Sequence, residues 1–450
     1  MHTNRYASRL LHAGRTLMRG SRPWAALAAT AAAGTTAAYL TAAASPVPSR
    51  HAAGTDTGTV TQSLSCGPQG YFIQCYSPGQ YRVAYGVTTL LSRGITGRGE
   101  TVAMPELANA PGPDFTDIRK DLAAFDSKFG LPPAKLKVTT TLAGAGAPYV
   151  AGTEEVEDTE IVHAIAPGAT LDVILVPHNA TASAADFTAA VTGLARVAVA
   201  QGAAVVSVSG SAGETFFTRA EVASVNAALQ QAAGRHVRVV ASSGDTGTIS
   251  DKGPPRQVSL PASDPLVLGV GGTALSASFQ TGAYQGEMAW NQDTDVSAGG
   301  YSSLFSRPSY QDGIPRIGAM RGVPDVAANA DSTTAMALTF TGGVLLPAQG
   351  TSAATPLWAA VIALADQEAG RHLGFVNPAI YAIARGPAYH RAFHDVVTGD
   401  NSVLWPTGVF VGYEAGPGWD PVTGWGSPDA RVLVPQLARY APDRLTARAR

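Results

Sequence analysis

The feature that most constrains this 450-residue chain is the alternation of short apolar runs with longer amphipathic segments. Each amphipathic segment carries apolar residues at helical spacing, whereas the short runs are rich in valine and leucine. Apolar strands joined by helices are typical of a parallel sheet that is covered by helices on both faces. We expect strands at 101–104, 171–176, 205–208, 237–240 and 266–270, and helices at 117–125, 184–200, 219–233 and 356–367.

Composition allows a large core and argues against a polyanionic partner. Apolar residues make up 45% of the chain and its net charge is −2, so it lacks the basic excess that nucleic-acid binding requires. The chain also holds 49 glycines and 30 prolines, which indicates many loops and tight turns. We therefore expect one α/β catalytic domain over residues 76–440, a monomer, and no nucleic-acid partner.

Residues 1–44 have the order of a secretory signal peptide. Five arginines precede a run rich in alanine and threonine, and Ala42–Ala44 would form the cleavage site. A membrane anchor is the alternative, but alanine partitions weakly into hydrocarbon, so we expect export to the extracellular space without stable membrane insertion. Residues 45–75 read as a linker in which Cys66 and Cys75 would form one small disulfide loop, and residues 441–450 as a frayed tail.

The strongest local motif is Gly350-Thr351-Ser352-Ala353-Ala354-Thr355-Pro356, which leads directly into an apolar helix. A serine at the start of a helix lies near free backbone N–H groups and the positive end of the helix dipole, which favour a developing oxyanion. Ser352 is therefore a candidate nucleophile. The alternative is that Thr351 or Ser352 only caps the helix, and the motif alone does not decide between the two.

A nucleophilic serine needs a base, and the acidic segment after Gly152 supplies one. Glu154 and Asp158 stand four residues apart on one helical face, where two carboxylates share protons as a unit. Taken alone, an ordinary acidic first turn capped by Thr153 is the better interpretation. Asp245 follows a strand and could donate to an oxyanion only when protonated, although it could also belong to a plain turn. We expect His163 to be a hydrogen-bonded helix residue rather than a catalyst.

In their order along the chain, these motifs resemble the sedolisin family of serine-carboxyl peptidases, whose fold is subtilisin-like. The series is Glu-x-x-x-Asp, Ala-Pro-Gly-Ala, Ser-Gly-Asp-x-Gly and Gly-Thr-Ser-x-x-x-Pro. Further matches lie at 260–263, 270–273, 290, 299–302 and 323–326, and the resemblance runs from about Tyr76 to about Leu433.

The resemblance implies a peptidase that hydrolyses peptide bonds at acid pH through an acyl-enzyme. It implies Ser352 as the nucleophile, Glu154 as the base, Asp158 as the acid that orients the base, and Asp245 in the oxyanion hole. Glu106 matches an acidic position that extends the carboxylate network in some members.

The resemblance also implies one structural Ca²⁺ near the carboxyl end of the chain. Oxygen ligands suit this cation, and they would come from Asp395, Val396, Gly416, Gly418 and Asp420. A loop rich in glycine and proline with stray acids is the alternative.

The implied substrate edge is the segment Ser209, Gly210 and Ser211, which would pair with an extended peptide. Many members have Trp where this chain has Gly210, so a relay through that Trp to Glu106 is missing. Members also usually carry a long pro-domain, whereas a short linker follows the expected signal, so we expect activity without a further maturation cut. A second hypothesis is therefore a catalytically silent secreted protein of the same fold that binds peptides. An esterase is disfavoured because a Gly-x-Ser-x-Gly elbow with a downstream His is absent.

Overall fold

The computed structural model describes residues 64–67, 73–107, 116–140, 151–176, 183–249, 256–340 and 342–440. All of these residues belong to one compact unit. The expected signal peptide, most of the linker before Ile73 and the tail at 441–450 lie outside the described residues. Among the helices that are described, none combines the length and the apolar character that crossing a bilayer requires.

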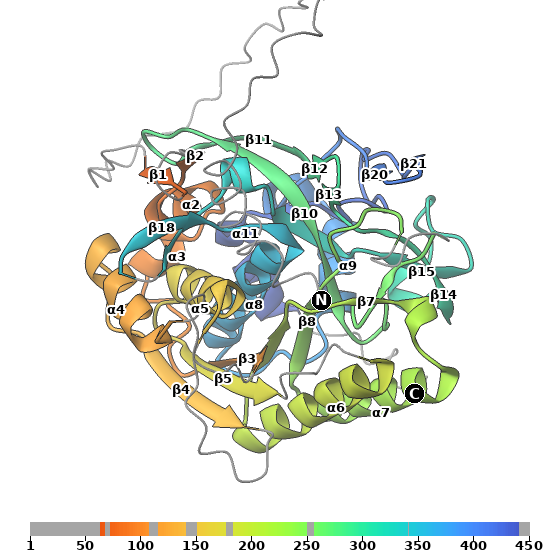
Figure 1. Ribbon diagram of the computed structural model, residues 1–450, viewed down its shortest axis with the longest axis horizontal. Helices are drawn as coiled ribbons and strands as arrows, with labels where there is room; N and C mark the ends of the chain where they lie inside the picture. Colours follow the sequence, from red (N-terminus) through yellow and green to blue (C-terminus); the bar gives the residue numbers. More distant parts are fainter. Residues whose placement is uncertain are drawn as a thin grey trace, which may run out of the picture. The chain divides into compact units, whose positions relative to one another are not determined.

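A central sheet built from eight of the described strands organises the unit (Figure 1). Its neighbouring strands are parallel, except that β10 and β11 are antiparallel. In spatial order the strands are β11 (Tyr284–Ala289), β10 (Leu268–Ala277), β8 (Arg238–Ser242), β6 (Val205–Val208), β3 (Thr101–Leu107), β5 (Thr170–Val176) and β4 (Lys135–Thr140), and β16 (Val326–Asn329) also pairs with β10.

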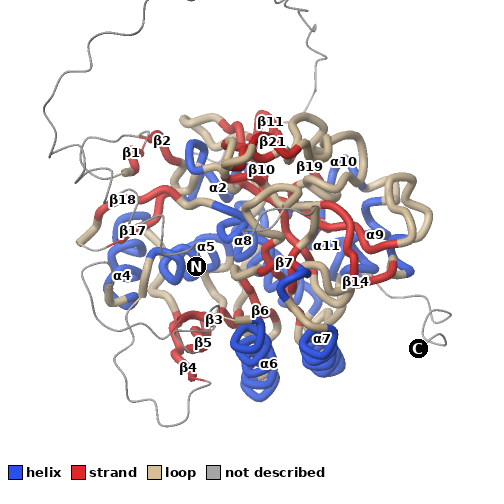
Figure 2. The backbone as a smooth tube through the Cα atoms, turned by 45° about the vertical axis from the view of Figure 1, so that its right-hand side comes forward, coloured by secondary structure: helices blue, strands red, loops and turns tan. Residues whose placement is uncertain are grey.

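The two faces of the sheet are covered by different helices, because successive side chains of a strand point to opposite faces. On β3, Val102 and Met104 belong to the core shared with α5 (Thr153–Ile165) and α8 (Gly350–Ala369). Ala103 belongs to the opposite core, which is shared with α6 (Ala184–Gln201) and α7 (Arg219–Gly234). Figure 2 shows α6 and α7 side by side at the bottom of the view, with β3 and β6 between these helices and α5 and α8.

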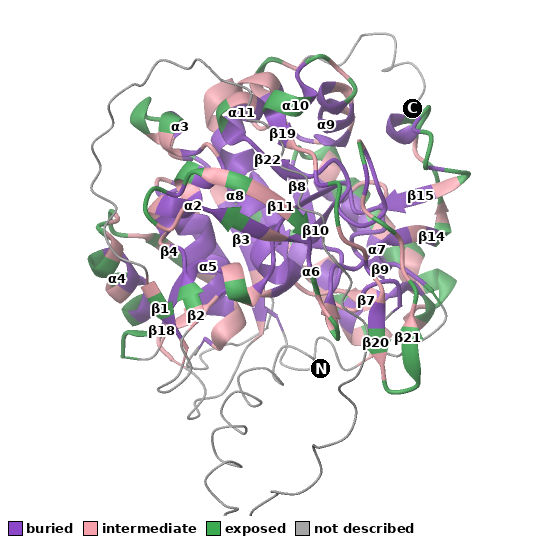
Figure 3. Ribbon diagram, turned by 90° about the horizontal axis from the view of Figure 1, so that it is seen from above, coloured by how far each residue is buried: buried purple, intermediate pink, exposed green. Residues whose placement is uncertain are grey.

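Shorter elements surround the sheet and its two helical layers, and many buried residues lie on the central strands and on α8 (Figure 3). The remaining helices are α2 (Pro78–Ala84), α3 (Thr88–Ser92), α4 (Ile118–Phe129), α9 (Asn377–Ala384), α10 (Tyr389–Ala392) and α11 (Ala430–Arg439). The paired strands are β1 (Leu64–Cys66) with β2 (Ile73–Cys75), β7 (Ala212–Gly213) with β9 (Ser259–Leu260), β12 (Asn291–Gln292) with β13 (Asp295–Val296), β14 (Gly300–Ser306) with β15 (Met320–Val323), β17 (Ala337–Phe340) with β18 (Val344–Pro347), β19 (Phe393–His394) with β22 (Ser427–Pro428), and β20 (Val403–Trp405) with β21 (Gly408–Phe410).

The structure confirms the predicted α/β fold, in which helices cover both faces of a mostly parallel sheet, and the expected Cys66–Cys75 disulfide joins β1 to β2. The predicted strands and most helices agree with the structure within a few residues, except that the strand expected at 266–270 continues to Ala277. Three strands of the sheet were not expected, namely β4 and β11 at its ends and β16 beside β10. In β4, Leu136 and Val138 alternate with lysines, which is the pattern of a strand with one buried face.

The helix expected at 356–367 begins at Gly350, six residues earlier. Gln349 is its N-cap residue, so neither Thr351 nor Ser352 caps the helix. Pro356, which we expected in the first turn, lies one turn further on. Its nitrogen carries no proton and cannot donate to the carbonyl of Ser352 four residues back, so that carbonyl stays free of the usual helical bond.

Candidate active site

The turn of the candidate nucleophile, which we call the nucleophile turn (Gln349–Ser352), forms the start of α8, and α8 packs against α5. Gly350 has φ +86°, a conformation that side chains with a Cβ rarely adopt. A Cβ at this position would also lie 2.7 Å from Oδ2 of Asp245. Glycine therefore lets the loop that follows β8 rest directly against the turn, and Ser352 is left 7% exposed two residues later.

The hydroxyl of Ser352 lies between two acceptors from different elements. The carboxyl group of Glu154, in the first turn of α5, lies beside this hydroxyl, and the interaction between the two lowers the pKa of Glu154. The hydroxyl also lies 3.3 Å from the backbone oxygen of Ser209, to which it can donate. The structure thus brings together the serine and the carboxylate that the sequence singled out, and the serine's proton has an acceptor at hand.

Asp158 lies one turn beyond Glu154 and is 1% exposed. The hydroxyl of Ser209 donates to its carboxyl group, at 2.7 Å from Oδ1 and 2.9 Å from Oδ2. The same hydroxyl lies 3.4 Å from the free carbonyl oxygen of Ser352. Ser209 was expected at the substrate edge, and its side chain also ties the acidic helix to the nucleophile turn.

The rest of the expected substrate edge is accessible. Ser209, Gly210 and Ser211 follow β6 without being paired in a strand, and all three are partly exposed. A Cβ built on Gly210 would meet no atom within 4 Å, so the space in front of it is open. The edge therefore lacks a strand partner beside Ser352, although the Ser209 carbonyl accepts bonds from the hydroxyls of Ser242 at 2.9 Å and Ser352 at 3.3 Å.

Asp245 lies on the opposite side of the nucleophile turn, three residues after β8 ends. Its Oδ1 accepts hydrogen bonds from the backbone N–H of Thr351 at 2.9 Å and from the Thr351 hydroxyl at 2.7 Å. The amide of Gly244 in turn donates to that hydroxyl at 3.2 Å. These bonds hold the Asp245 carboxyl group next to the residue that precedes the serine.

Burial dominates the electrostatics of this group of carboxyls. It raises the pKa of Glu154 to about 8, and the negative charges of Glu155 and Asp245 add to the rise while the Ser352 hydrogen bond opposes it. Burial also raises the pKa of Asp158 and of Glu106 well above the ordinary range, with further contributions from neighbouring acids. Glu154 is only half-buried and accepts a bond from Ser352, so it is the member best placed to hold the first negative charge.

Sequence reasoning missed three further buried acids on α5, which are Glu155, Glu157 and Glu160. Glu157 accepts a bond from the backbone N–H of Gln349 at 2.8 Å, and Glu160 accepts one from the backbone N–H of Thr339 at 2.7 Å. The spacing could have indicated Glu157, because a residue three positions after Glu154 shares its face. His163 behaves as expected for a helix residue: its Nε2 lies 2.9 Å from both the Pro132 carbonyl oxygen and the Asp126 carboxylate.

The expected calcium ligands Asp395 and Asp420 meet at a single loop. The N–H of Gly418 donates to both carboxylate oxygens of Asp395 at 3.1 and 3.2 Å, and the N–H of Gly416 donates to Asp420 at 3.1 Å. Asp420 is fully buried, and this burial raises its pKa to about 6 although it also accepts bonds from Val422 and Thr423. Two carboxylates in one loop suit a hard cation, which would have to displace the N–H groups that they now accept from.

The same loop lacks further acids. Among the described residues there is no group of three or more His, Cys, Asp or Glu side chains that could hold a metal ion. The expected set holds only two carboxylates, so its other ligands, at Val396, Gly416 and Gly418, would have to be backbone carbonyls.

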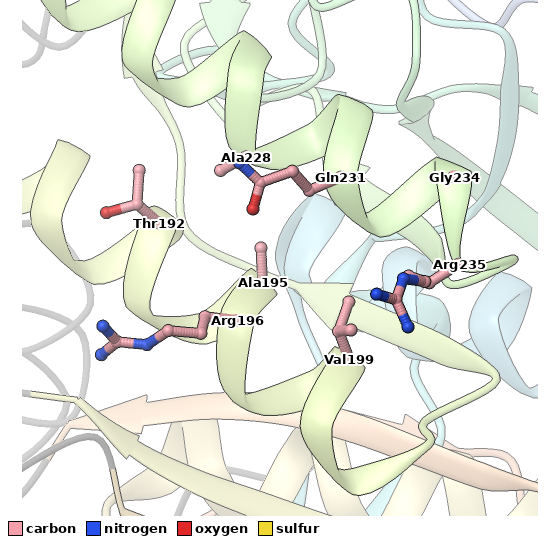
Figure 4. Close-up of a pocket in the computed structure, with 8 residues that line it drawn as sticks. All are labelled: Thr192, Ala195, Arg196, Val199, Ala228, Gln231, Gly234 and Arg235. Carbon is pink, nitrogen blue, oxygen red and sulfur yellow. The ribbon is translucent and has the colours of Figure 1, made fainter.

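A surface groove of about 460 Å³ lies between α6 and α7, on the other side of the sheet from α5 and α8 (Figure 4). Its lining consists of Thr192, Ala195, Arg196, Val199, Ala228, Gln231, Gly234 and Arg235. None of the predicted site residues lines it, so this groove is separate from the candidate active site.

Comparison with known proteins agrees with this geometry. Residues 140–378 match the model of the subtilase family, Peptidase S8. The chain is 34% identical to kumamolisin of Bacillus sp. (strain MN-32) over 368 residues, which is 78% of this chain and 62% of kumamolisin. It is 37% identical to sedolisin of Pseudomonas sp. (strain 101) over 205 residues, which is 43% of this chain and 33% of that protein.

The solved structure of Pseudomonas sedolisin, a serine-carboxyl proteinase complexed with pseudo-iodotyrostatin, is also similar. It superposes with a TM-score of 0.70 at 26% identity, covering 81% of this chain and 98% of the solved chain. The chain thus matches less than two thirds of the length of the curated relatives, 62% of kumamolisin and 33% of sedolisin.

The raised pKa values predict how folding stability depends on pH. A carboxyl whose pKa is higher in the folded than in the unfolded state stabilises the fold fully below its unfolded pKa of about 4.5, and this stabilisation is lost as pH rises through the folded pKa. We therefore expect the thermal midpoint to fall between pH 4 and pH 8. Glu160 is buried and has a raised pKa, so Glu160→Gln should raise the midpoint at pH 8 relative to the unmodified protein but not at pH 4. Differential scanning calorimetry at both pH values tests this, and a midpoint that rises toward pH 8 would contradict it.

Proposed function

We propose, from the premise that the chain belongs to the subtilase family and resembles its sedolisin members, that it is a secreted serine-carboxyl peptidase. The observation that carries this proposal is the position of the Glu154 carboxyl beside the Ser352 hydroxyl, at the contact of α8 with α5. A half-buried acid next to a serine supplies a base without histidine.

In the proposed reaction Ser352 attacks the carbonyl carbon of the scissile peptide bond while Glu154 takes its proton. The tetrahedral intermediate then collapses, the C–N bond breaks, and Glu154 returns the proton to the leaving amine. Water next enters, gives a proton to Glu154 and attacks the acyl-enzyme, and collapse of the second intermediate releases the acid and restores the Ser352 hydroxyl.

Two further acids assist this chemistry in the proposal. Asp158, held by the Ser209 hydroxyl, orients Glu154 and keeps it in a shared network. Asp245 lies beside the nucleophile turn, and in its protonated form it can donate a hydrogen bond to the oxyanion. Glu106 is buried at the end of β3 and its pKa is raised by burial and by Asp158, so it would extend the same network as a neutral acid.

The substrate in this proposal is an extended peptide that lies along Ser209–Ser211. These residues are partly exposed, follow β6 without a strand partner and lie next to Ser352, which supports main-chain pairing with the peptide. The open space at Gly210 leaves room on this edge for a bulky substrate side chain.

The resemblance implies activity at acid pH, whereas the raised pKa of Glu154 favours ionisation of the base at higher pH. Acid pH keeps Asp245 protonated, as its proposed role requires, and it keeps most of the neighbouring acids neutral. Burial, however, raises the pKa of Glu154 to about 8, which delays ionisation of the base. The proposal of an acid enzyme thus requires that the cluster release its first proton well below that value, and the Ser352 hydrogen bond acts in this direction.

Several features extend the proposal beyond the active site. These are the signal peptide at 1–44, the linker at 45–75, the peptidase domain at 76–440, the tail at 441–450, an extracellular location and a monomeric state. One structural Ca²⁺ belongs here too, bound through the Asp395 and Asp420 carboxylates.

The first test removes the nucleophile. Ser352→Ala should lower cleavage of a mixed peptide library by at least about 10³-fold, because no other group can form the acyl-enzyme. Ser224→Ala, which removes an exposed hydroxyl from α7, serves as the control and should cleave normally. Mass spectrometry of the digests measures both. If the unmodified protein binds peptides but cleaves none, the catalytically silent hypothesis replaces this one.

A second test concerns Asp245. Asp245→Asn places a permanently neutral donor at this position, so the rate should fall through imperfect geometry while the alkaline limb of the kcat/KM profile moves to higher pH. An alkaline limb that stays in place would show that another group controls it and would remove Asp245 from the oxyanion role.

A third test concerns calcium. Excess chelator should lower the thermal midpoint, since a cation bound only by the native state stabilises it by about 2.7 kcal/mol at a hundred times its Kd. The midpoint of Asp420→Asn should respond less to the chelator than that of Asp312→Asn, an acid outside the 416–420 loop. An unchanged midpoint of the unmodified protein, with no metal found by elemental analysis, would exclude the ion.

A further inference from the structure

The acidic helix carries a third buried carboxyl on the face that meets the nucleophile turn. Glu157 lies three residues after Glu154 and directly before Asp158, and it is 4% exposed. Neither the proposed proton transfers nor the proposed substrate contacts use it. The proposed chemistry therefore does not explain why Glu157 is buried so close to the site.

The contacts of Glu157 lead to the backbone of Ser352. Its Oε2 accepts a hydrogen bond at 2.8 Å from the N–H of Gln349, the residue that caps α8 and opens the nucleophile turn. The next two N–H groups are held as well, since Gly350 donates to the Ala330 carbonyl at 2.8 Å and Thr351 to Asp245 at 2.9 Å. Three consecutive amides are thus anchored immediately before the serine, and the first of them is anchored to the helix that carries the base.

Burial and the neighbouring charges favour the neutral form of Glu157. Burial raises its pKa well above the ordinary range, the carboxylates of Glu154, Asp158 and Asp245 raise it further, and the hydrogen bond from Gln349 opposes the rise. Each of these carboxylates disfavours a further negative charge. A neutral carboxyl still accepts a hydrogen bond through its carbonyl oxygen, so protonation leaves the bond to Gln349 possible.

We propose that Glu157 is a positioning residue, whose carboxyl anchors the Gln349 N–H and so ties the turn that carries Ser352 to the helix that carries Glu154. Nucleophile and base then keep their separation when the loops around them move. This inference rests on the proposed function, because it assigns Glu157 a part in placing the proposed nucleophile.

The test compares an isosteric polar and an isosteric apolar replacement. Glu157→Gln keeps an oxygen acceptor without a charge, so its kcat should stay within about twofold of the unmodified protein and its pH profile should not move. Glu157→Met keeps the length but removes the acceptor. Its kcat should fall about ten- to a hundredfold, as expected for a misplaced catalytic group, with little change in KM because the substrate edge is untouched.

Glu160 provides a matched control on the same helix. It is also a buried acid that accepts a backbone N–H, but it holds Thr339 on β17 instead of the nucleophile turn. Glu160→Met should therefore lower the thermal midpoint about as much as Glu157→Met does while leaving kcat unchanged. Equal losses of kcat in both methionine variants would reduce Glu157 to a general stabilising role and overturn the proposal.

Other results would overturn it as well. Full kcat in Glu157→Met, or a loss in Glu157→Gln as large as in Glu157→Met, would show that the acceptor is not what matters. A shift of the acid limb in Glu157→Gln would show that residue 157 acts through its charge.

If Glu157→Met does not fold, Glu157→Asp replaces it, since the shorter side chain withdraws the acceptor from Gln349 and should also lower kcat. Absence of Ser352-dependent cleavage in the unmodified protein would instead count against the proposed function itself.

Discussion

The packing of α5 against α8 is the contact on which the rest of the site depends. It places a row of carboxyls in the interior of the protein, where an ionised carboxylate would lose much hydration energy. The acids tolerate this position because several of them accept bonds from backbone or hydroxyl groups. Glu157, Asp158 and Glu160 in this way bond to Gln349, Ser209 and Thr339 on three different segments. The helix is therefore docked by largely neutral acids as well as by its apolar side chains.

A consequence of this docking is that structure and protonation are linked. Burial raises the pKa values of Glu154, Glu157, Asp158 and Glu160, and a negative charge on Glu154 raises the pKa values of Glu157 and Asp158 further. One negative charge can be accommodated where the Ser352 hydroxyl meets Glu154. Additional charges would have to form in a less polar environment, next to the first. The site is thus suited to a state with a single ionised carboxyl among neutral ones.

Much of the fold and part of the site could be predicted from the sequence, because their signals are local. The strands of the parallel sheet are continuous apolar runs, and the four-residue spacing of Glu154 and Asp158 defines a helical face. The start of α8 could not be predicted in this way, since Gly350 and Pro356 normally mark the outside of a helix. The helix tolerates both because Gly350 takes a positive φ and because the Ser352 carbonyl, left without a helical partner, lies near the Ser209 hydroxyl. Contacts between distant segments, such as Glu157 with Gln349, have no signature in either segment alone.

The residues that are proposed to handle the proton lie far apart in the chain, which affects when the active site forms during folding. The candidate base and the acids that support it occupy one helix of thirteen residues, whereas the nucleophile begins another helix almost two hundred residues later. A folding intermediate that had formed the central sheet but not yet seated α5 on α8 would contain Ser352 without an acceptor for its proton. In the proposed mechanism, Ser352 therefore becomes reactive only once α5 has docked on α8, so the formation of this contact would couple folding to activity.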